Sequence, residues 1–417
     1  MNLFLVTMAL LPIAVSAVMA GEASRPFPGG VDADLWVLAG QSNMQGAGLI
    51  TKSYKPDRKI MMLTMDNKWI PAVSPIHRMY DNDAAPVIKK MFHVVAPGFS
   101  DDAYRQTAEA SKTHPIGGMG PDWFFAKHIA KHTGRSIGLI PCAFGGTSMA
   151  HWDPATKDQG GESLYGSMMQ RIAMVGGRIK GILWYQGESD AAPGGDKAFE
   201  KTFLRLVDSI RRDTGISDLP FIYVQISRVC IESQDMGPSW EAVRETQRTA
   251  AARRSNLFVV PAIDLPLDDL IHIGTAGQER LGRRMAEVAL DRVYNQKDHA
   301  TAIDYDSYEL LPKTDDLHNT MRIRFKGVNG KLQSKGDPTG FQLRPEVSGK
   351  DGPCVFKVEF DPKDPNAVIV WYTKPITVPV KLYYGVGLNP YVNVVDSKDM
   401  AAPAFGPITI KPNLPAR

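Results

Sequence analysis

Short apolar runs alternate with amphipathic stretches from about residue 35 to residue 296. The apolar runs predict buried strands at Leu35–Ala39, Ser136–Cys142, Ile179–Tyr185, Phe221–Ile226 and Leu257–Ala262. The stretches with apolar residues at helical spacing predict helices at Trp123–His132, Tyr165–Gly176, Ala198–Thr214, Trp240–Arg253 and Thr275–Tyr294. Strands that are separated by helices indicate βαβ units, so we expect an α/β fold with a mostly parallel sheet.

The connection between the first two predicted strands is much longer than the others. It spans residues 45–121 and is rich in His, Asp, Met and Pro. Connections of this length in compact domains are often functional, so we expect this segment to contribute to a ligand site.

The pattern changes after about residue 300. Short stretches that alternate apolar and polar residues follow, at Met321–Phe325, Val355–Phe360 and Ala367–Tyr372. Turn signals such as Asn329-Gly330 separate them. We therefore expect a small antiparallel β-domain over residues 303–417. No Gly/Ser-rich linker precedes it, which favours packing against the α/β domain at 35–296.

Composition excludes several classes of partner. Of 417 residues, 43% are hydrophobic and 22% are charged, as in an ordinary globular protein. The net charge of +3 is too small to indicate binding to nucleic acid or to a membrane surface. The apolar N-terminus ends in Val18-Met19-Ala20, which predicts a signal peptide at 1–20 and export to the periplasm or outside the cell. No Lys or Arg precedes the apolar run, so an uncleaved anchor is the alternative.

Cysteine and histidine give little sign of a metal or cofactor. Export permits disulfides, but Cys142, Cys230 and Cys354 cannot all pair and their pairing stays open. His128 and His132 are four residues apart on a predicted helix, without the Glu of a His-Glu-x-x-His zinc site. A solvated helix face is the favoured interpretation, and we expect no cofactor and no metal.

Three glycine-bearing turns follow three of the predicted strands. They are Gly40-Gln41-Ser42, Phe144-Gly145-Gly146-Thr147-Ser148 and Tyr185-Gln186-Gly187-Glu188-Ser189-Asp190. If the strands are parallel neighbours, all three turns meet at one edge of the sheet, where ligand sites gather in α/β folds. Backbone N–H groups of such turns can stabilise an oxyanion.

Ser42 and a later Asp-x-x-His pattern together indicate a serine hydrolase. His272 would accept the Ser42 proton as general base, and Asp269 would orient the imidazole. The N–H groups of Ser42 and of Gly145 or Gly146, with the side-chain amide of Gln186, would form the oxyanion hole.

Each of these features has a simpler explanation. A serine after a strand is more often a helix N-cap than a nucleophile. Ser148 and Ser189 compete with Ser42, and none of the three stands in a Gly-x-Ser-x-Gly nucleophile elbow. The joint order of the motifs on successive strand ends is what favours the hydrolase interpretation.

The motifs also resemble a known family. Gly40-Gln41-Ser42-Asn43-Met44, Gly145-Gly146-Thr147-Ser148 with Trp152 after it, Gln186-Gly187-Glu188-Ser189-Asp190 and Asp269-x-x-His272 appear in this order. Together they are similar to the sialate O-acetylesterase group, which belongs with the acetylxylan esterases of carbohydrate esterase family six to the SGNH hydrolase superfamily. The resemblance covers about residues 35–295.

This resemblance implies a flavodoxin-like, three-layer fold and metal-free ester hydrolysis through an acyl-enzyme. It implies Ser42 as nucleophile, His272 as base, Asp269 as acid and Gln186 as an oxyanion donor. Tyr185 stands where relatives often carry His. The C-terminal Tyr383-Tyr384-Gly385, Asn389-Pro390, Asn393 and Ala402-Pro403-Ala404-Phe405 resemble the tail of sialate O-acetylesterases, which favours sialic acid over xylan.

The leading hypothesis is therefore an exported carbohydrate O-acetylesterase whose partner is an acetylated sugar. We expect contacts to the sugar from Gln41, Asn43, Trp152, Asp153 and Glu188. The alternatives are an acetylxylan or broader carboxylesterase, and a glycan-binding protein without activity. Acetate release that requires Ser42 would exclude the binding protein, and rapid cleavage of longer acyl esters would favour the broader carboxylesterase.

Overall fold

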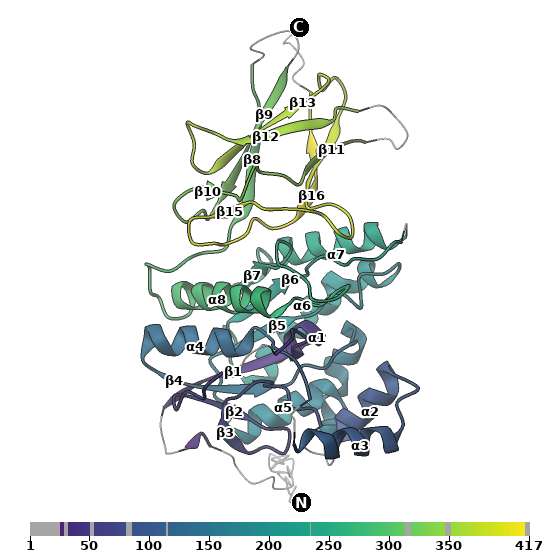
Figure 1. The fold of residues 1–417 in the computed structure, drawn as a ribbon, viewed down its shortest axis with the longest axis vertical. Coiled ribbons are helices and arrows are strands. Elements are labelled where there is room, and N and C mark those ends of the chain that lie inside the picture. The colour runs from purple at the N-terminus through teal and green to yellow at the C-terminus, as the bar shows by residue number, and fades with distance from the viewer. Residues whose placement is uncertain are drawn as a thin grey trace, which may run out of the picture.

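The computed structural model describes residues 26–28, 32–50, 54–80, 86–113, 116–233, 235–312, 318–346 and 352–412. Its centre is a seven-stranded sheet with the order β3-β2-β4-β1-β5-β6-β7 (Figure 1). The strands are β1 (Ala33–Gly40), β2 (Ile60–Leu63), β3 (Trp69–Pro71), β4 (Ser136–Pro141), β5 (Gly181–Tyr185), β6 (Phe221–Gln225) and β7 (Leu257–Pro261). All are parallel to their neighbours except β3, which is antiparallel to β2. The five predicted strands are confirmed.

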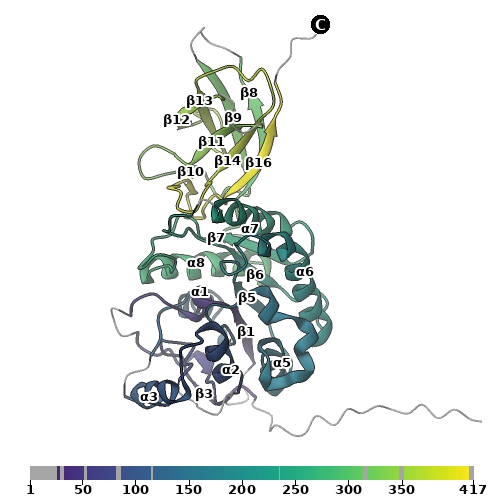
Figure 2. The ribbon, with the colours of Figure 1, turned by 90° about the vertical axis from the view of Figure 1, so that its right-hand side faces the viewer.

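Helices cover both faces of this sheet, which makes three layers. The α-helices are α1 (Ser42–Gln45), α2 (Pro86–Val95), α3 (Asp101–Ser111), α4 (Asp122–Thr133), α5 (Leu164–Met174), α6 (Gly195–Thr214), α7 (Met236–Ala250) and α8 (Thr275–Arg292). Two 3-10 segments, η2 (Met149–Trp152) and η3 (Pro154–Glu162), precede α5. Figure 2 shows α8 on one side of the sheet and α5 and α6 on the other. The α/β fold class is confirmed.

The order of the central strands explains where the chemistry gathers. Taken in chain order without the β2–β3 hairpin, β4-β1-β5-β6-β7 gives the order 2-1-3-4-5 that is typical of flavodoxin-like sheets. The chain leaves β1 in one direction to reach β4 and later returns to place β5 on the other side of β1. Ligands in such folds bind where the strand order reverses, which here is the carboxyl end of β1.

The long connection at 45–121 is more structured than its composition suggests. It contains β2, β3, α2 and α3, and β2 extends the sheet beside β4. The expectation of one long connection without strands or helices is corrected. The strands were missed because β2 is only four residues long and β3 only three, too short for a clear alternation.

The C-terminal part is built of antiparallel sheets. A four-stranded sheet has the order β12-β13-β9-β8, a three-stranded one β11-β14-β16 and a small one β10-β15. The strands are β8 (Asp304–Leu310), β9 (Asn319–Lys326), β10 (Leu332–Gln333), β11 (Phe341–Pro345), β12 (Val355–Phe360), β13 (Ala367–Tyr372), β14 (Val380–Tyr384), β15 (Val395–Asp396) and β16 (Phe405–Ile410). The aromatic rings of Phe325, Phe341, Tyr384 and Phe405 pack together between them.

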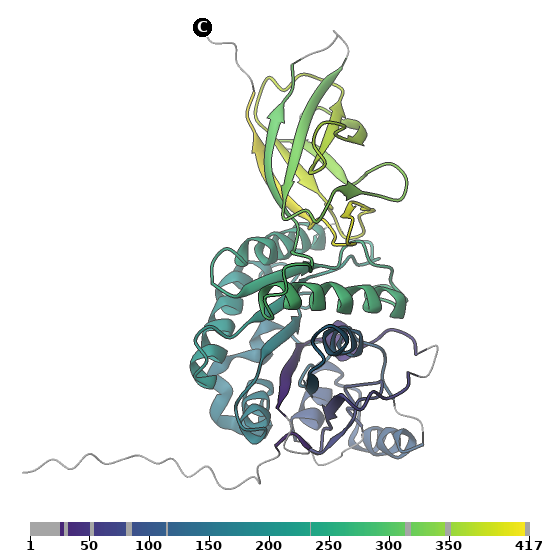
Figure 3. The same ribbon diagram turned by 90° about the vertical axis from the view of Figure 1, so that its left-hand side faces the viewer.

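The β-sheets stand at one end of the α/β part, above α7 and α8 (Figure 3). Gln225, at the end of β6, donates to the Ala404 carbonyl (2.8 Å) and accepts from the Ala404 N–H (2.9 Å). The buried Arg244 of α7 donates to the Gly387 carbonyl at 2.6 Å. These buried contacts hold the two parts together.

The expectations about cysteines, the signal peptide and membrane-spanning helices have the following outcomes. Cys142, Cys230 and Cys354 are all free. The predicted signal peptide at 1–20 lies outside the described residues. Among the helices that the structure describes, none has the length and apolar character needed to cross a membrane.

Candidate active site

Ser42 lies at the point where β1 turns into α1. Gly40, the last residue of β1, has a φ of +123°, and a Cβ there would lie 2.1 Å from the Tyr185 carbonyl oxygen. Only glycine tolerates both that conformation and that contact. The Gln41 N–H donates to the same carbonyl at 2.8 Å, so the turn is fixed to β5. Ser42 follows as the first residue of α1 and is partly exposed.

The structure brings the three predicted triad residues together. His272 Nε2 lies 2.9 Å from Ser42 Oγ, and His272 Nδ1 lies 2.6 Å from Asp269 Oδ2. Because a carboxylate only accepts, the imidazole proton belongs on Nδ1, which leaves Nε2 free to accept from the serine hydroxyl. This is the tautomer that a general base needs.

The Asp269 carboxylate is held by the loop it belongs to. Its Oδ1 accepts from the N–H groups of Ile271 (2.8 Å) and His272 (2.7 Å). Partial burial by itself raises the pKa of Asp269, but these N–H groups and the His272 side chain outweigh it, and the pKa is lowered. Asp269 therefore stays ionised beside His272.

A buried polar layer lies beneath the triad. Asn43 donates to Glu188 Oε1 at 2.8 Å and accepts from the Ile273 N–H at 3.0 Å. Glu188 is buried, and this burial raises its pKa to about 6 against the opposing hydrogen bond from Asn43. One side chain thus ties the Ser42 turn, the third glycine turn and the His272 loop to one another.

The second glycine turn lies against Ser42. A Cβ at Gly145 would be 3.4 Å from the Ser42 Cβ, and the Phe144 N–H donates to the Gly40 carbonyl at 3.0 Å. The Gly145 N–H donates to Gln45 Oε1 at 2.7 Å. Within the described ranges, no residue accepts from the N–H groups of Ser42 or Gly146. The three predicted turns therefore share one edge, as expected.

Gln186 does not have the surroundings of an oxyanion donor, which corrects the expectation. It is fully buried, and its amide nitrogen donates to the Thr147 carbonyl (3.1 Å) and to Asp190 Oδ2 (2.5 Å). Both amide protons are therefore used: one joins the third turn to the second, and the other stays within the third turn. Strand-end placement alone does not tell which way a buried amide points.

The prediction that Trp152 contacts the sugar is corrected as well. Trp152 is fully buried, donates to Thr147 Oγ1 at 3.1 Å and packs edge-on against Trp184. Asp153 caps η3 at the Ala155 N–H and forms an ion pair with Arg205 at 2.9 Å. Trp152 thus supports the fold around the site. The Asp153 side chain is 39% exposed, so its contact to the sugar stays a prediction.

Gln41, Asn43 and Glu188 are buried too, with 3%, 1% and 6% of their surface exposed. When the side-chain amide of Gln41 is oriented so that both its oxygen and its nitrogen have suitable partners, the nitrogen donates to Glu188 Oε2 (3.3 Å) and to the Thr147 carbonyl (3.1 Å). These three residues position the turns and are not open to a sugar.

The competing serines lack the surroundings of a nucleophile. Ser148 Oγ lies 3.2 Å from His151 Nδ1, but that same nitrogen accepts from the Ser148 N–H at 3.0 Å. This is a capping box at the start of η2. Ser189 has no histidine partner among the described residues.

Two residues with a role near the site were missed by the sequence analysis. The side-chain oxygen of Gln45 accepts the hydrogen bond from the Gly145 N–H. His77 is buried and accepts from the Ala143 N–H at 3.2 Å, with its other ring nitrogen 3.6 Å from Asp122. It thus fixes the start of the second turn. No local pattern marks either residue, because the partners lie 66 or more positions away.

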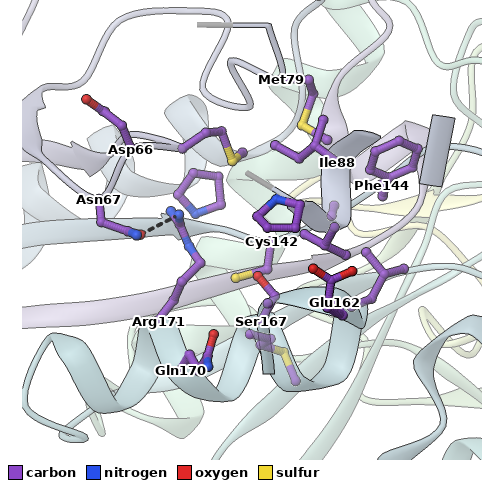
Figure 4. Close-up of a pocket in the computed structure, with 18 of the residues that line it drawn as sticks. Asp66, Asn67, Met79, Ile88, Cys142, Phe144, Glu162, Ser167, Gln170 and Arg171 are labelled. Atoms are coloured by element: carbon purple, nitrogen blue, oxygen red, sulfur yellow. Dashed lines mark hydrogen bonds between the residues drawn. The ribbon is translucent and has the colours of Figure 1, made fainter. Parts of the chain in front are cut away.

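The second turn also forms one wall of a pocket of about 450 Å³ (Figure 4). Met79, Ile88 and Phe144 give it apolar walls, and Arg171 lies at its edge, hydrogen-bonded to Asn67 at 2.8 Å. Ser42 and His272 do not line it. The pocket adjoins the turn beside the triad, at the same edge of the sheet.

Known proteins share this architecture. A probable carbohydrate esterase of Arabidopsis thaliana is 29% identical over 292 residues, which are 64% of this chain and 94% of that protein. The crystal structure of a carbohydrate acetylesterase from Xanthomonas citri covers 89% of this chain and 80% of its own, with 19% identity and a TM-score of 0.63. At that identity, the second likeness supports the fold, including the C-terminal sheets.

A family model matches more than half of the chain. It is described as carbohydrate esterase, sialic acid-specific acetylesterase, and it aligns with residues 32–291. This range contains the whole α/β sheet, the three glycine turns and the Asp269–His272 loop. The chain therefore belongs to the carbohydrate esterase family of sialic acid-specific acetylesterases.

Proposed function

We propose that the protein removes O-acetyl groups from sugars by a Ser-His-Asp mechanism. The observation that carries this proposal is the continuous chain from Ser42 Oγ through His272 to Asp269, with separations of 2.9 and 2.6 Å. A serine aligned with a base that is itself oriented by a carboxylate is the arrangement that activates a hydroxyl.

The first half of the reaction forms an acyl-enzyme. Ser42 Oγ attacks the acetyl carbonyl carbon as its proton passes to His272 Nε2. The resulting oxyanion is stabilised by backbone N–H groups of the first two turns. His272 then gives this proton to the sugar oxygen as the ester bond breaks, and the acetyl group stays on Ser42.

The second half repeats these steps with water. His272 takes a proton from the water, whose oxygen attacks the acetyl carbon. The bond to Ser42 breaks, the serine recovers its proton from His272, and acetate leaves. Asp269 stabilises the imidazolium in both halves.

The oxyanion hole that we propose consists of the N–H groups of Ser42 and Gly145. The Gly145 N–H faces the amide oxygen of Gln45, which is itself a carbonyl oxygen and thus resembles the acyl oxygen in its bonding. We propose that the substrate carbonyl replaces the Gln45 oxygen there. The Gly146 N–H, free among the described residues, is the alternative second donor.

Acetylated sialic acid is the substrate that we propose. The description of the matched family supports this choice. The C-terminal motif gives weaker support than its sequence suggests. Tyr384 is buried, and its hydroxyl accepts a hydrogen bond from the Val394 N–H at 3.2 Å. Export through residues 1–20 remains part of the proposal.

The test is acetate release from O-acetylated sialic acid and from acetylated xylan, with wild type, Ser42→Ala and Ser148→Ala. We expect release from sialic acid that is lost in Ser42→Ala and kept in Ser148→Ala. Release from xylan alone would keep the mechanism and change the substrate. Release that survives in Ser42→Ala would overturn the mechanism, and sugar binding without release would favour a glycan-binding protein.

A further inference from the structure

Three imidazole rings and one carboxylate meet far from Ser42. His128 and His132 lie on α4, Glu287 lies on α8, and His299 follows α8 in the segment that leads to β8. Helices α4 and α8 run side by side on one face of the sheet (Figure 1). The sequence analysis interpreted His128 and His132 as part of a solvated face, but the fold supplies two further polar groups from about 160 residues away in the sequence.

The donor atoms of this cluster converge. His128 Nε2 lies 2.7 Å from Glu287 Oε1, and His299 Nδ1 lies 3.0 Å from Glu287 Oε2. One ligand atom from each of these three residues falls within 4.8 Å of the others. The ring centre of His132 is 4.5 Å from that of His128 and 4.8 Å from that of His299.

These distances are close to those around a bound metal ion. A tetrahedral zinc ion with bonds of about 2.0 to 2.1 Å separates its ligand atoms by about 3.3 Å. The N···O separations in the cluster would have to open by less than about 1 Å to reach that value. His128, Glu287 and His299 are largely shielded, with 12% to 19% of each side chain exposed, so they can form a site without large rearrangement.

Hydrogen bonds alone explain only part of the cluster. Glu287 can satisfy His128 and His299, and it also accepts from the Ala300 N–H at 3.0 Å. His132 has no carboxylate of its own among the described residues, although it lies against both other rings.

We propose that His128, Glu287 and His299 bind one divalent transition-metal ion, with Zn²⁺ as the best fit, and that the His132 ring, which lies against both other imidazoles, supports them from beside the site. Imidazole nitrogens with one carboxylate oxygen are ligands that suit zinc, and three protein ligands leave one position of the tetrahedron for a further ligand. The ion would tie α4 and α8 to the segment that leads into the β-sheets. The site shares no residue with the triad, so it does not depend on the proposed esterase mechanism.

Zinc binding by the full-length protein tests this inference. The protein is treated with a chelator, dialysed and titrated with ZnSO₄, and bound zinc is measured by elemental mass spectrometry. We expect one zinc ion per chain, a rise in Tm of at least about 2 °C on loading, and loss of both in His299→Gln and in His128→Gln. A matched control is His93→Gln, since His93 also pairs with one carboxylate, Asp101, and no second imidazole contacts it among the residues that the structure describes.

His132→Asn provides a variant that keeps the fold, because His132 is exposed. We expect it to weaken zinc binding by at least about tenfold in affinity, as the loss of a metal ligand or of its close support does. Wild type that binds no zinc, or zinc binding that is unchanged in folded His132→Asn and His299→Gln, would overturn the inference. Acetate release should be equal with and without zinc.

Discussion

The carboxylate of Glu188 is buried, with only 6% of the residue exposed to solvent. Its side chain lies beneath the triad, where the hydrogen bond from Asn43 works to lower its pKa. Burial nonetheless dominates and raises the pKa to about 6. At neutral pH the protein therefore keeps a buried charge whose cost is offset only in part by its partners.

This charge predicts how stability depends on pH. The pKa of Glu188 is about 6 in the folded protein, above the ordinary value of 4.5. The stability that its protonation gives is fully present below pH 4.5 and is lost as the pH rises through 6. Glu188→Gln should therefore stabilise the protein at pH 7.5 by about 2 kcal/mol, and by much less at pH 4.5. Thermal unfolding of both proteins at the two pH values measures this difference, and a pH-independent difference would contradict it.

Asn43 is a positioning residue for the catalytic loop. Replacing it with Ala leaves the Ile273 N–H and one side of Glu188 without a partner, so the His272 loop loses its link to the Ser42 turn. For Asn43→Ala we expect kcat to fall by about 10- to 100-fold with KM little changed. Steady-state kinetics on protein whose folding is verified by circular dichroism gives the answer. A rise in KM of about 10- to 100-fold with unchanged kcat would instead indicate that Asn43 contacts the substrate directly.

At the scale of elements, the sequence predicted the strands, turns and helix that carry the site better than the directions of their side chains. The strands that end in the three glycine turns are long apolar runs, and their parallel pairing places Ser42, Gly145 and Gln186 at one edge. The Asp269–His272 loop is fixed by α8, which begins at Thr275 as predicted. Periodicity is sufficient for such features because each is encoded by neighbours in the chain.

The errors concern the direction of side chains after a turn. Gln186 and Trp152 were expected to face the substrate, yet both are turned into the protein, where Thr147 accepts from each of them. Gln45 and His77 were missed because their partners come from distant segments. These orientations depend on packing between elements, which the order of residues does not reveal.

The burial of Trp152 makes a prediction about η2. Trp152→Phe removes the donor to Thr147 and part of the packing against Trp184, so it should destabilise the protein by about 1 to 3 kcal/mol. Its KM for acetylated sugar should stay within about twofold of wild type, because the ring is not exposed. Urea unfolding and kinetics are compared with Trp371→Phe in β13, whose ring is partly exposed. A large rise in KM with unchanged stability would restore the role as a sugar contact.

At the scale of the whole molecule, the β-sheets brace the catalytic part. The Val229 N–H donates to the Leu388 carbonyl at 2.9 Å, and the next residue, Cys230, donates to the Leu270 carbonyl at 2.7 Å. Leu270 belongs to the loop that carries His272, so one short segment connects the β-sheets with the triad. Asn389, one of the C-terminal residues that resemble the esterase tail, lies beside this contact, where it accepts from Arg228 at 2.7 Å.

A buried ion-pair network strengthens the same contact. Arg284 of α8 is fully buried and donates to Asp264 at 2.7 Å and to the Asp399 carbonyl at 2.6 Å. Arg284→Met leaves Asp264 and Asp399 without this partner, and we expect a loss of about 3 to 5 kcal/mol. The neighbouring Arg283 also pairs with Asp399 but is partly exposed, so Arg283→Met should cost no more than about 1 kcal/mol. Calorimetry that shows equal losses for the two variants would contradict this account of the interface.

The identity of the nucleophile is the central claim, and a fluorophosphonate probe tests it most directly. Such a probe forms a stable bond only with a serine that a neighbouring base activates. After labelling, peptide mapping by mass spectrometry should find one adduct per chain, on Ser42, and none in His272→Ala. An adduct on Ser148 or Ser189, or labelling of Ser42 that does not need His272, would contradict the mechanism.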